Sequence, residues 1–510
     1  MSVCFTISEA GDCFLDGHLL HPGDDPLGAA RRDLEGLLAK AGPEDLLVLA
    51  GSGLGWHARA ALDQPQGPRV VVYEPDPERR ALLACLGPSL SGADLSCDQE
   101  ALAESLGRSM VYGGGKGRVA LFTPAAYRRA APQVEAAARD TLERARSRAF
   151  VDSHTRAAHA NAWLGHIAEN FKRVLDIPDI SLLAGVMEDI PALVVGAGPS
   201  LDQSLTALGP ARDKALVLAA ASALGPLAKA SLAPHLAFAL ESLDESRQFT
   251  HARPGETILA AASSGNPRHF NQWPGPQTLF HLQSWLSRLA GQGHSLPTGG
   301  HATSAAFSLA LLLGCDPIIL VGQDLAFTGG RIHAQNRPGG EDGGLPETTA
   351  VPAIGGGTVE TSHVMLSYIT WYQEAASFLR ARHPERRVVN ATAAGALLPG
   401  FQHQDLESAL GSLRSLELDF EALATGLAQL PRPRAADLSQ RLAQARAEVR
   451  RSQTLLEVEG LPTAWEHSPP DSAARAALAQ AASEGDHQAA RRELEAFATA
   501  LSRISESLHE

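Results

Sequence analysis

The sequence of 510 residues predicts an α/β protein with a Rossmann-like N-terminal domain, a central doubly wound α/β domain and an α-helical C-terminal domain. Short, wholly apolar runs alternate with helical segments, which is typical of a parallel sheet covered on both faces. From about residue 405, Ala, Arg, Glu, Leu and Gln dominate in the pattern of amphipathic helices. We therefore expect domains at 1–154 (with a helical linker), 155–404 and 405–510.

The N-terminal region contains one strand–turn–helix–strand unit. The apolar run 46–50 leads into Gly51-Ser-Gly53-Leu-Gly55, and the run 70–73 ends at Glu74. Glu74 follows Gly51 by 23 residues, roughly where a ribose-binding carboxylate would lie. S-adenosylmethionine is the obvious ligand. No Asn/Asp-Pro-Pro-aromatic segment or clear nucleophile accompanies the turn, so a degenerate structural unit is the favoured interpretation.

The central region supplies most of the expected strands and one long loop. Strands are expected at 192–195, 215–219, 236–240, 257–261, 278–281, 318–321 and 388–390. The Gly-, Pro- and acid-rich stretch 329–357 predicts a loop, and loops of that length are usually functional or disordered. Helices are expected at 305–313 and, in the C-terminal region, at 437–459 and 486–508.

Two Gly-rich turns are candidate anion sites. The strand 192–195 runs into Gly196-Ala-Gly198-Pro199-Ser200, where glycines allow close backbone approach and a following helix start offers N–H groups. No lysine lies between 172 and 214, so the turn is not a P-loop. A strand-to-helix turn that simply needs glycine is the alternative.

The second turn precedes the expected helix 305–313. Gly299 and Gly300 are followed by Thr303 and Ser304, whose hydroxyls could face a phosphate together with the first N–H groups of the helix. One of these hydroxyls could instead serve as an N-cap. Both roles are compatible.

Polar residues follow two of the central strands. Glu241-Ser242 comes after the run 236–240, and Gly322-Gln323-Asp324 after 318–321. Ligands of open α/β sheets bind at this carboxyl edge. A carboxylate and a carboxamide there could hold a sugar, and His333, in the Gly-rich loop, is a candidate acid or base. Solvated side chains are the alternative.

Bulk properties exclude several classes of protein. A net charge of −14 argues against a dedicated nucleic-acid binder. The five cysteines are scattered, without metal-ligand spacing, which fits a reducing cytoplasm. Neither a signal peptide nor a run of about 18 apolar residues is apparent, so we expect no membrane span.

The central region resembles the MptE-like domain of motility-associated factor (Maf) glycosyltransferases. The matching residues are Gly196-Ala-Gly-Pro-Ser-Leu-Asp202, Gly299-Gly300, Gly314–Gly330 with the specific Gly-Gln-Asp-Leu-Ala-Phe segment, His333-Ala334, Thr361, Trp371, Asn390-Ala-Thr392 and Gly395. The N-terminal Gly51–His57 and Glu74-Pro75 also look like that family. One departure is His301-Ala302, where relatives commonly carry small residues.

This resemblance implies a glycosyltransferase that moves a nonulosonic acid (sialic, pseudaminic or legionaminic type) from a CMP-activated donor to Ser/Thr hydroxyls of flagellin in the cytoplasm. It implies a sialyltransferase-like, metal-independent central domain with no cofactor besides the nucleotide sugar. The central region contains no Asp-x-Asp motif of the kind that binds a metal ion, which agrees with a metal-independent mechanism. We expect His333, Asp324 and Glu241 to be catalytic, with His333 favoured over Asp324 as the base. Asn390 and Thr392 join Gly196, Gly198, Pro199, Ser200, Ser242, Gly299, Gly300, Thr303, Ser304, Gly322 and Gln323 as expected substrate-binding residues.

Two other functions remain open. Archaeal MptE enzymes share this domain but transfer diphosphate from ATP to a 6-hydroxymethylpterin, a reaction that normally requires Mg²⁺ held by carboxylates. That activity would leave the first and last domains without a role. A non-catalytic flagellar assembly factor is the third interpretation.

Overall fold

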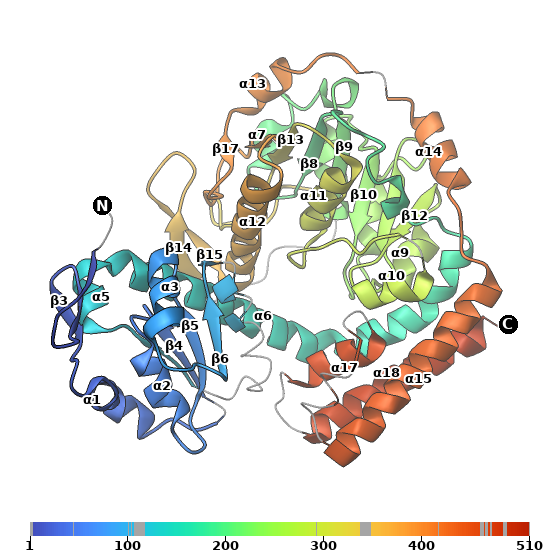
Figure 1. Cartoon of the computed structure of the whole chain (residues 1–510). Helices are drawn as coiled ribbons and strands as arrows, with labels where there is room; N and C mark the ends of the chain where they lie inside the picture. The colour runs from blue at the N-terminus through green and yellow to red at the C-terminus, as the bar shows by residue number, and fades with distance from the viewer. Residues whose placement is uncertain are drawn as a thin grey trace. The chain divides into compact units, whose positions relative to one another are not determined.

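The computed structural model describes residues 4–508 apart from 44, 100, 104, 107–117, 292, 337–347, 417, 460–463, 465–467, 470–471 and 483–486. The chain divides into two compact units. The first contains residues 1–154, 455–466 and 477–493, and the second contains residues 155–454, 467–476 and 494–510. Each unit is described by itself below (Figure 1).

The first unit contains a four-stranded parallel sheet of order β6-β5-β4-β7, preceded by a small antiparallel sheet. Alternate residues of β4 enter different cores: Val48 packs on one face of the sheet and Leu47 on the other. The sheet is therefore buried on both faces, which confirms the Rossmann-like prediction. Its elements are β1 (Phe5–Ile7), β2 (Cys13–Leu15), β3 (His18–His21), α1 (Pro26–Leu38), β4 (Leu46–Ala50), α2 (Trp56–Leu62), β5 (Arg69–Tyr73), α3 (Pro77–Leu86), β6 (Ala93–Ser96), β7 (Val119–Phe122), α5 (Ala125–Ala130) and the start of α6 (Pro132–Asn170).

The second unit is built on an eight-stranded parallel sheet of order β12-β11-β10-β9-β8-β13-β16-β17. Its strands are β8 (Ala192–Val195), β9 (Leu216–Ala220), β10 (Leu236–Ala239), β11 (Ile258–Ala262), β12 (Gln277–Phe280), β13 (Ile318–Val321), β16 (Val388–Asn390) and β17 (Gln402–His403). The strands expected from apolar runs are all present, with ends that agree closely. The central doubly wound α/β prediction is confirmed.

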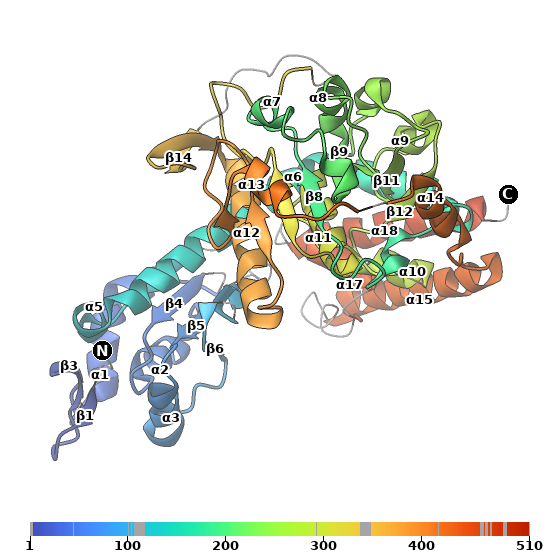
Figure 2. The same cartoon turned by 90° about the horizontal axis from the view of Figure 1, so that it is seen from above.

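Helices cover both faces of this sheet (Figure 2). Val194 packs with α11 and α12 in one core, whereas Leu193 and Val195 pack with α7 and α8 in the other. The helices of this part are α7 (Leu201–Ser204), α8 (Leu224–Lys229), α9 (Pro267–Gln272), α10 (Ser284–Ala290), α11 (Ala302–Leu313) and α12 (His363–Arg382), with the 3₁₀ helix η5 (Ser246–His251).

The prediction of a loop over 329–357 is wrong for residues 348–352. Residues 348–352 form β14 (Thr348–Pro352), which pairs antiparallel with β15 (Thr358–Ser362). β-Branched residues in both segments favour the extended pairing over a loop. Part of the expected loop, 337–347, lies outside the described residues.

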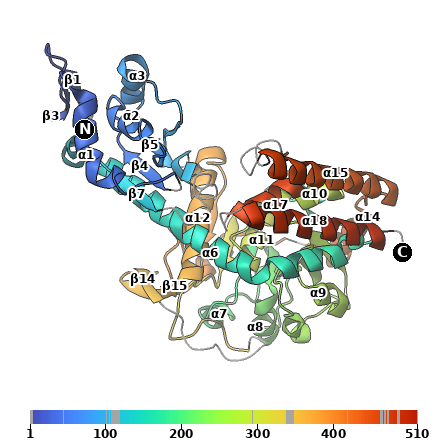
Figure 3. The same ribbon diagram turned by 90° about the horizontal axis from the view of Figure 1, so that it is seen from below.

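The C-terminal region is helical, as expected (Figure 3). Its helices are α13 (Leu406–Gly411), α14 (Phe420–Gln429), α15 (Ala435–Glu459), α17 (Ala473–Ala482) and α18 (His487–Ser507). The first two pack on the eight-stranded sheet, because Leu406 and Leu410 of α13 and Leu427 of α14 are buried in its two cores. Among the described helices, none is both long and apolar enough to cross a membrane.

One buried carboxyl group of the second unit affects its stability. Oδ1 of Asp179 accepts hydrogen bonds from the N–H and the hydroxyl of Ser181, at 2.9 and 2.7 Å. Oδ2 has no hydrogen-bond partner among the described residues, and Nε2 of His281 lies 3.7 Å away. Burial raises the pKa of Asp179 to about 6. The folded state therefore favours the protonated acid.

We expect Asp179→Asn to stabilise the protein at neutral pH. With a raised folded pKa, the stability linked to Asp179 is full below the ordinary carboxyl pKa and is lost as the pH rises through about 6. Asparagine keeps the oxygen that Ser181 bonds and carries no charge. Thermal unfolding should show a gain on the order of 3 kcal/mol at about pH 7.5 that disappears at about pH 4. An equal effect at both pH values would contradict this explanation.

Candidate functional site

The strand order places a ligand crevice between β8 and β13. From β8 the chain proceeds outward through β9 to β12, whereas β13, β16 and β17 extend the sheet on the other side. Ligands of open α/β sheets bind at such a switch point, beyond the carboxyl ends of the strands. The turn at Gly196 follows β8, and Gly322-Gln323-Asp324 follows β13. The two motifs singled out in the sequence are therefore neighbours.

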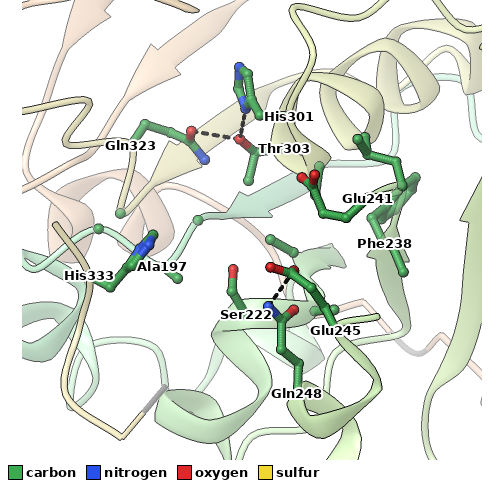
Figure 4. A pocket seen from close by; sticks show the side chains of 18 of the residues that line it. Ala197, Ser222, Phe238, Glu241, Glu245, Gln248, His301, Thr303, Gln323 and His333 are labelled. Carbon is green, nitrogen blue, oxygen red and sulfur yellow. Dashed lines mark hydrogen bonds between the residues drawn. The ribbon is translucent and has the colours of Figure 1, made fainter. Parts of the chain in front are cut away.

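A cavity of about 340 Å³ lies at this edge (Figure 4). Eight of the predicted site residues line it: Gly196, Gly198, Glu241, Thr303, Gly322, Gln323, Asp324 and His333. In Figure 4, His333 lies beside Ala197, and Glu241 is on the opposite side of the view. Among the residues that the structure describes, those that line the cavity include no lysine or arginine.

The glycines of the first turn allow two parts of the protein to approach each other. A Cβ atom at Gly196 would lie 2.5 Å from the carbonyl oxygen of Gly322, and one at Gly198 would overlap Oδ1 of Asp324. The N–H groups of Gly196 and Gly198 donate to the carbonyl groups of Val321 and Gly322, at 2.8 and 2.9 Å. The helix that follows, α7, is a single turn, so its dipole is small. This geometry supports the alternative in which the turn itself requires glycine.

The carboxylate of Asp324 is held inside the protein. The residue is 1% exposed, and its carboxylate accepts hydrogen bonds from the N–H of Ser200 (2.9 Å) and from the Ser200 hydroxyl (2.6 Å). Burial raises the pKa of Asp324, and the bonds from Ser200 oppose that change. Asp324 thus fixes the turn at Gly196 to the end of β13.

His333 lies on a short segment, 331–335, that is fastened to the first turn. The N–H of Ala334 donates to the carbonyl of Ala197 at 2.8 Å. The carboxylate of Asp202 accepts a bond from Nη1 of Arg331 (2.9 Å) and from the N–H of Gln335 (3.1 Å). The residues two positions before and after His333 are therefore both tied to Asp202, which fixes where the imidazole enters the cavity.

Three side chains form a hydrogen-bonded row at another wall of the cavity. The hydroxyl of Thr303 donates to Oε1 of Gln323 at 2.8 Å, and Nδ1 of His301 lies 2.8 Å from the same hydroxyl. The backbone N–H of Gln323 donates to the hydroxyl of Thr392 at 3.1 Å. The His301 ring also packs on Tyr368, with ring centroids 4.3 Å apart.

The other predicted substrate-binding residues do not line the cavity. They are Pro199, Ser200, Ser242, Gly299, Gly300, Ser304, Asn390 and Thr392. Several of them support residues that do: Ser200 holds Asp324, and Asn390 accepts a bond from the N–H of Thr392 (3.1 Å), which in turn holds Gln323. Direct contact of these residues with a ligand stays a prediction.

The N-cap interpretation of the second turn is wrong in detail. Helix α11 begins at Ala302, so its N-cap is His301. The Ser304 hydroxyl accepts a bond from the N–H of Gly299 (2.9 Å) and donates to the His301 carbonyl. Thr303 and Ser304 thus lie inside the first turn of α11.

Sequence reasoning missed several lining residues. Ser222 follows β9 and could have been found by the same rule of strand ends. Glu245, Gln248 and His269 come from the segment around η5 and from α9, and Tyr368 comes from α12. No spacing in the sequence connects those elements with the Gly-rich turns.

The described residues also bear on metal binding. Among the residues that the structure describes, no group of three or more His, Cys, Asp or Glu could hold a metal ion. Metal independence itself stays a prediction.

The Gly-rich turn of the first unit is filled by its own side chains. The fully buried carboxylate of Glu74 accepts bonds from Ser52, Arg79 and the hydroxyl of Tyr127. The N–H of Gly53 donates to the same Tyr127 hydroxyl at 3.1 Å. A Cβ atom at Gly51 would overlap the Tyr127 ring. The acid that would hold a ribose is therefore already bonded inside the protein.

We expect the first unit not to bind S-adenosylmethionine. The physical reason is that Tyr127 occupies the approach to the turn and that both carboxylate oxygens of Glu74 already accept bonds from the protein. Calorimetric titration with S-adenosylmethionine should give no heat of binding in a preparation that circular dichroism and thermal unfolding show to be folded. Micromolar binding would show that the unit opens.

One family model matches part of the chain. The family model described as 6-hydroxymethylpterin diphosphokinase MptE-like matches residues 165–330, about a third of the chain. A search of curated proteins gave no significant match.

The whole chain is similar in structure to the Maf glycosyltransferase from Magnetospirillum magneticum AMB-1. The TM-score is 0.58 at 16% sequence identity, over 100% of this chain and 90% of that one. The two proteins share a fold. The fold that the Maf resemblance implied is confirmed, and so is the MptE-like central segment.

Proposed function

We propose that this protein is a glycosyltransferase that moves a nonulosonic acid from a CMP-activated donor to Ser/Thr hydroxyls of flagellin in the cytoplasm. The carrying observation is the cavity at the β8/β13 switch point, lined by His333, Gln323 and Glu241, in a chain with the fold of a Maf glycosyltransferase. The donor class and the flagellin acceptor rest on the motif resemblance. No cofactor besides the nucleotide sugar is proposed.

Under this proposal the cavity residues have separate roles. The acceptor hydroxyl attacks the anomeric carbon, the bond from that carbon to the phosphate oxygen breaks, and CMP leaves with the electron pair. His333 takes the hydroxyl proton, because a serine or threonine hydroxyl is a weak nucleophile. Asp324 acts as a positioning residue through Ser200, and the Glu241 carboxylate accepts bonds from sugar hydroxyls. Neutral donors stabilise the leaving phosphate, without a metal ion.

A nucleotide titration tests this proposal. We expect CMP to bind with or without Mg²⁺, and ATP with Mg²⁺ to bind more weakly. The MptE-like match over 165–330 favours the diphosphokinase as the second candidate. If the protein binds ATP in the presence of Mg²⁺ but does not bind CMP, the result supports the diphosphokinase activity. If it binds neither nucleotide, the result supports an assembly factor.

We further propose that the helices beyond α14 contribute to acceptor recognition, since a protein acceptor needs more surface than a sugar cavity provides. Among the described residues, the two core clusters of the eight-stranded sheet contain none beyond 430. Arg441 and Phe497 contact α10, at the carbonyl of Ala290 and at the ring of Trp285, so a chain shortened to residues 1–430 is first checked for folding by circular dichroism. The folded shortened chain should keep its affinity for CMP and lose its affinity for flagellin, measured by calorimetry and by pull-down. Unchanged flagellin binding would place the docking surface elsewhere.

A further inference from the structure

Gln323 carries a buried donor atom that the described part of the protein leaves unused. The residue is 2% exposed, and its Nε2 has no hydrogen-bond partner. Figure 4 shows the side chain at the wall of the cavity, with its oxygen bonded to Thr303. A buried amide donor without a hydrogen-bond partner costs free energy. Its position at a cavity wall therefore points to a ligand group that accepts a hydrogen bond from it.

The direction of the hydrogen bonds fixes which end of the amide faces the cavity. Oε1 of Gln323 accepts from the hydroxyl of Thr303 and lies 3.5 Å from the hydroxyl of Tyr372. Because Thr303 donates its hydroxyl hydrogen to Oε1, the hydroxyl oxygen can accept a hydrogen bond from Nδ1 of His301. Burial lowers the pKa of His301 to about 3, so one proton remains on the ring. That proton belongs on Nδ1.

A second feature of the same wall favours an anionic group. Helix α11, 12 residues long, begins at Ala302, and Ala302 and Thr303 both line the cavity. The first N–H groups of a helix have no acceptor inside the helix and lie at the positive end of its dipole. The described residues that line the cavity include no lysine or arginine, and this helix start and the Gln323 amide supply neutral hydrogen-bond donors suited to an oxyanion.

We infer that Nε2 of Gln323 and the start of α11 form an oxyanion subsite that holds the phosphate of the CMP moiety, and that His301 and Thr303 are positioning residues that keep the amide in this orientation. The inference rests on the proposed function, because it names the group of the CMP donor that this wall binds. It also gives a role to His301, the residue that departs from the family pattern.

Paired ligands separate this subsite from the rest of the cavity. CMP and cytidine differ only in the phosphate, so a substitution that disrupts the subsite should lower the affinity for CMP and not the affinity for cytidine. In the full-length protein, Gln323→Leu should lower CMP affinity about 10- to 100-fold and change cytidine affinity less than about 3-fold. Thr303→Val should act in the same direction because it releases the amide, whereas Thr303→Ser should restore CMP affinity.

The control is Gln203→Leu, which alters an exposed glutamine of α7 in the same unit. Far-UV circular dichroism and thermal unfolding confirm that each variant is folded. A folded Gln323→Leu protein with wild-type CMP affinity would overturn the subsite while leaving the proposed function standing, as would an equal loss for CMP and cytidine. Failure of the wild-type protein to bind CMP would overturn both proposals.

Discussion

His333→Ala should lower the rate of flagellin glycosylation by roughly 10²–10⁴-fold, the usual size of a general-base contribution. The loss should appear in kcat, because removal of the base leaves the walls that hold the nucleotide intact. CMP affinity measured by calorimetry should therefore stay at the wild-type level. His251→Ala, at an exposed position of η5, is the matched control and should change neither quantity.

The hydrogen bonds that hold residues 331–335 to Asp202 provide a second test of the role of His333. Asp202→Ala removes the acceptor for Arg331 and Gln335 and should lower kcat about 10- to 100-fold by displacing the imidazole. In a His333→Ala background the same change should have no further effect, because the group that it positions is gone. If His333→Ala keeps a near-normal rate, the base is Asp324 or another residue of the cavity.

Gly198→Val should abolish measurable CMP binding. A Cβ atom at this position overlaps Oδ1 of Asp324 and lies 2.7 Å from the carbonyl oxygen of Gly322, so valine displaces both. Asp324 then loses its bonds to Ser200, and the end of β13 shifts at the cavity wall. We also expect a lower Tm, since a well-packed site tolerates added methyl groups poorly.

Gly255→Ala is the control for this prediction, because a Cβ atom at Gly255 would meet nothing within 4 Å. Calorimetry with CMP and thermal unfolding distinguish a local effect from global unfolding. A folded Gly198→Val protein with wild-type CMP affinity would show that the close contact between the turns after β8 and β13 does not shape the nucleotide site.

The strands and the switch point could be predicted because they depend on local pattern. A run such as Ile318–Val321 is apolar on both faces and is followed at once by polar residues, so both the strand and its functional end are visible in the sequence. The same rule of strand ends correctly placed Glu241 and Gln323 at one edge of the sheet, where they line one cavity. The reason for the glycine at position 198 was not visible, because its constraint comes from Asp324, which is distant in the sequence.

Features set by distant segments could not be predicted in this way. Tyr127 fills the N-terminal Gly-rich turn and accepts a hydrogen bond from Gly53, which is 74 residues away in the sequence. No local sequence pattern predicts this contact. Tyr368 reaches the cavity from α12, and the pairing of β14 with β15 depends on a partner strand within a Gly-rich stretch. The alternative in which Thr303 or Ser304 caps α11 is wrong, because the Ser304 hydroxyl bonds Gly299 across the turn and the N-cap is His301.

The most direct test of the proposed function is a transfer reaction with purified components. Flagellin is incubated with this protein and a CMP-activated nonulosonic acid, and intact-mass and peptide mass spectrometry follow the acceptor. The proposal predicts a mass increase of one nonulosonic acid residue on serine or threonine, with release of one CMP per sugar and loss of the reaction in His333→Ala. Unmodified flagellin under these conditions, together with transfer of diphosphate from ATP to a 6-hydroxymethylpterin, would contradict it.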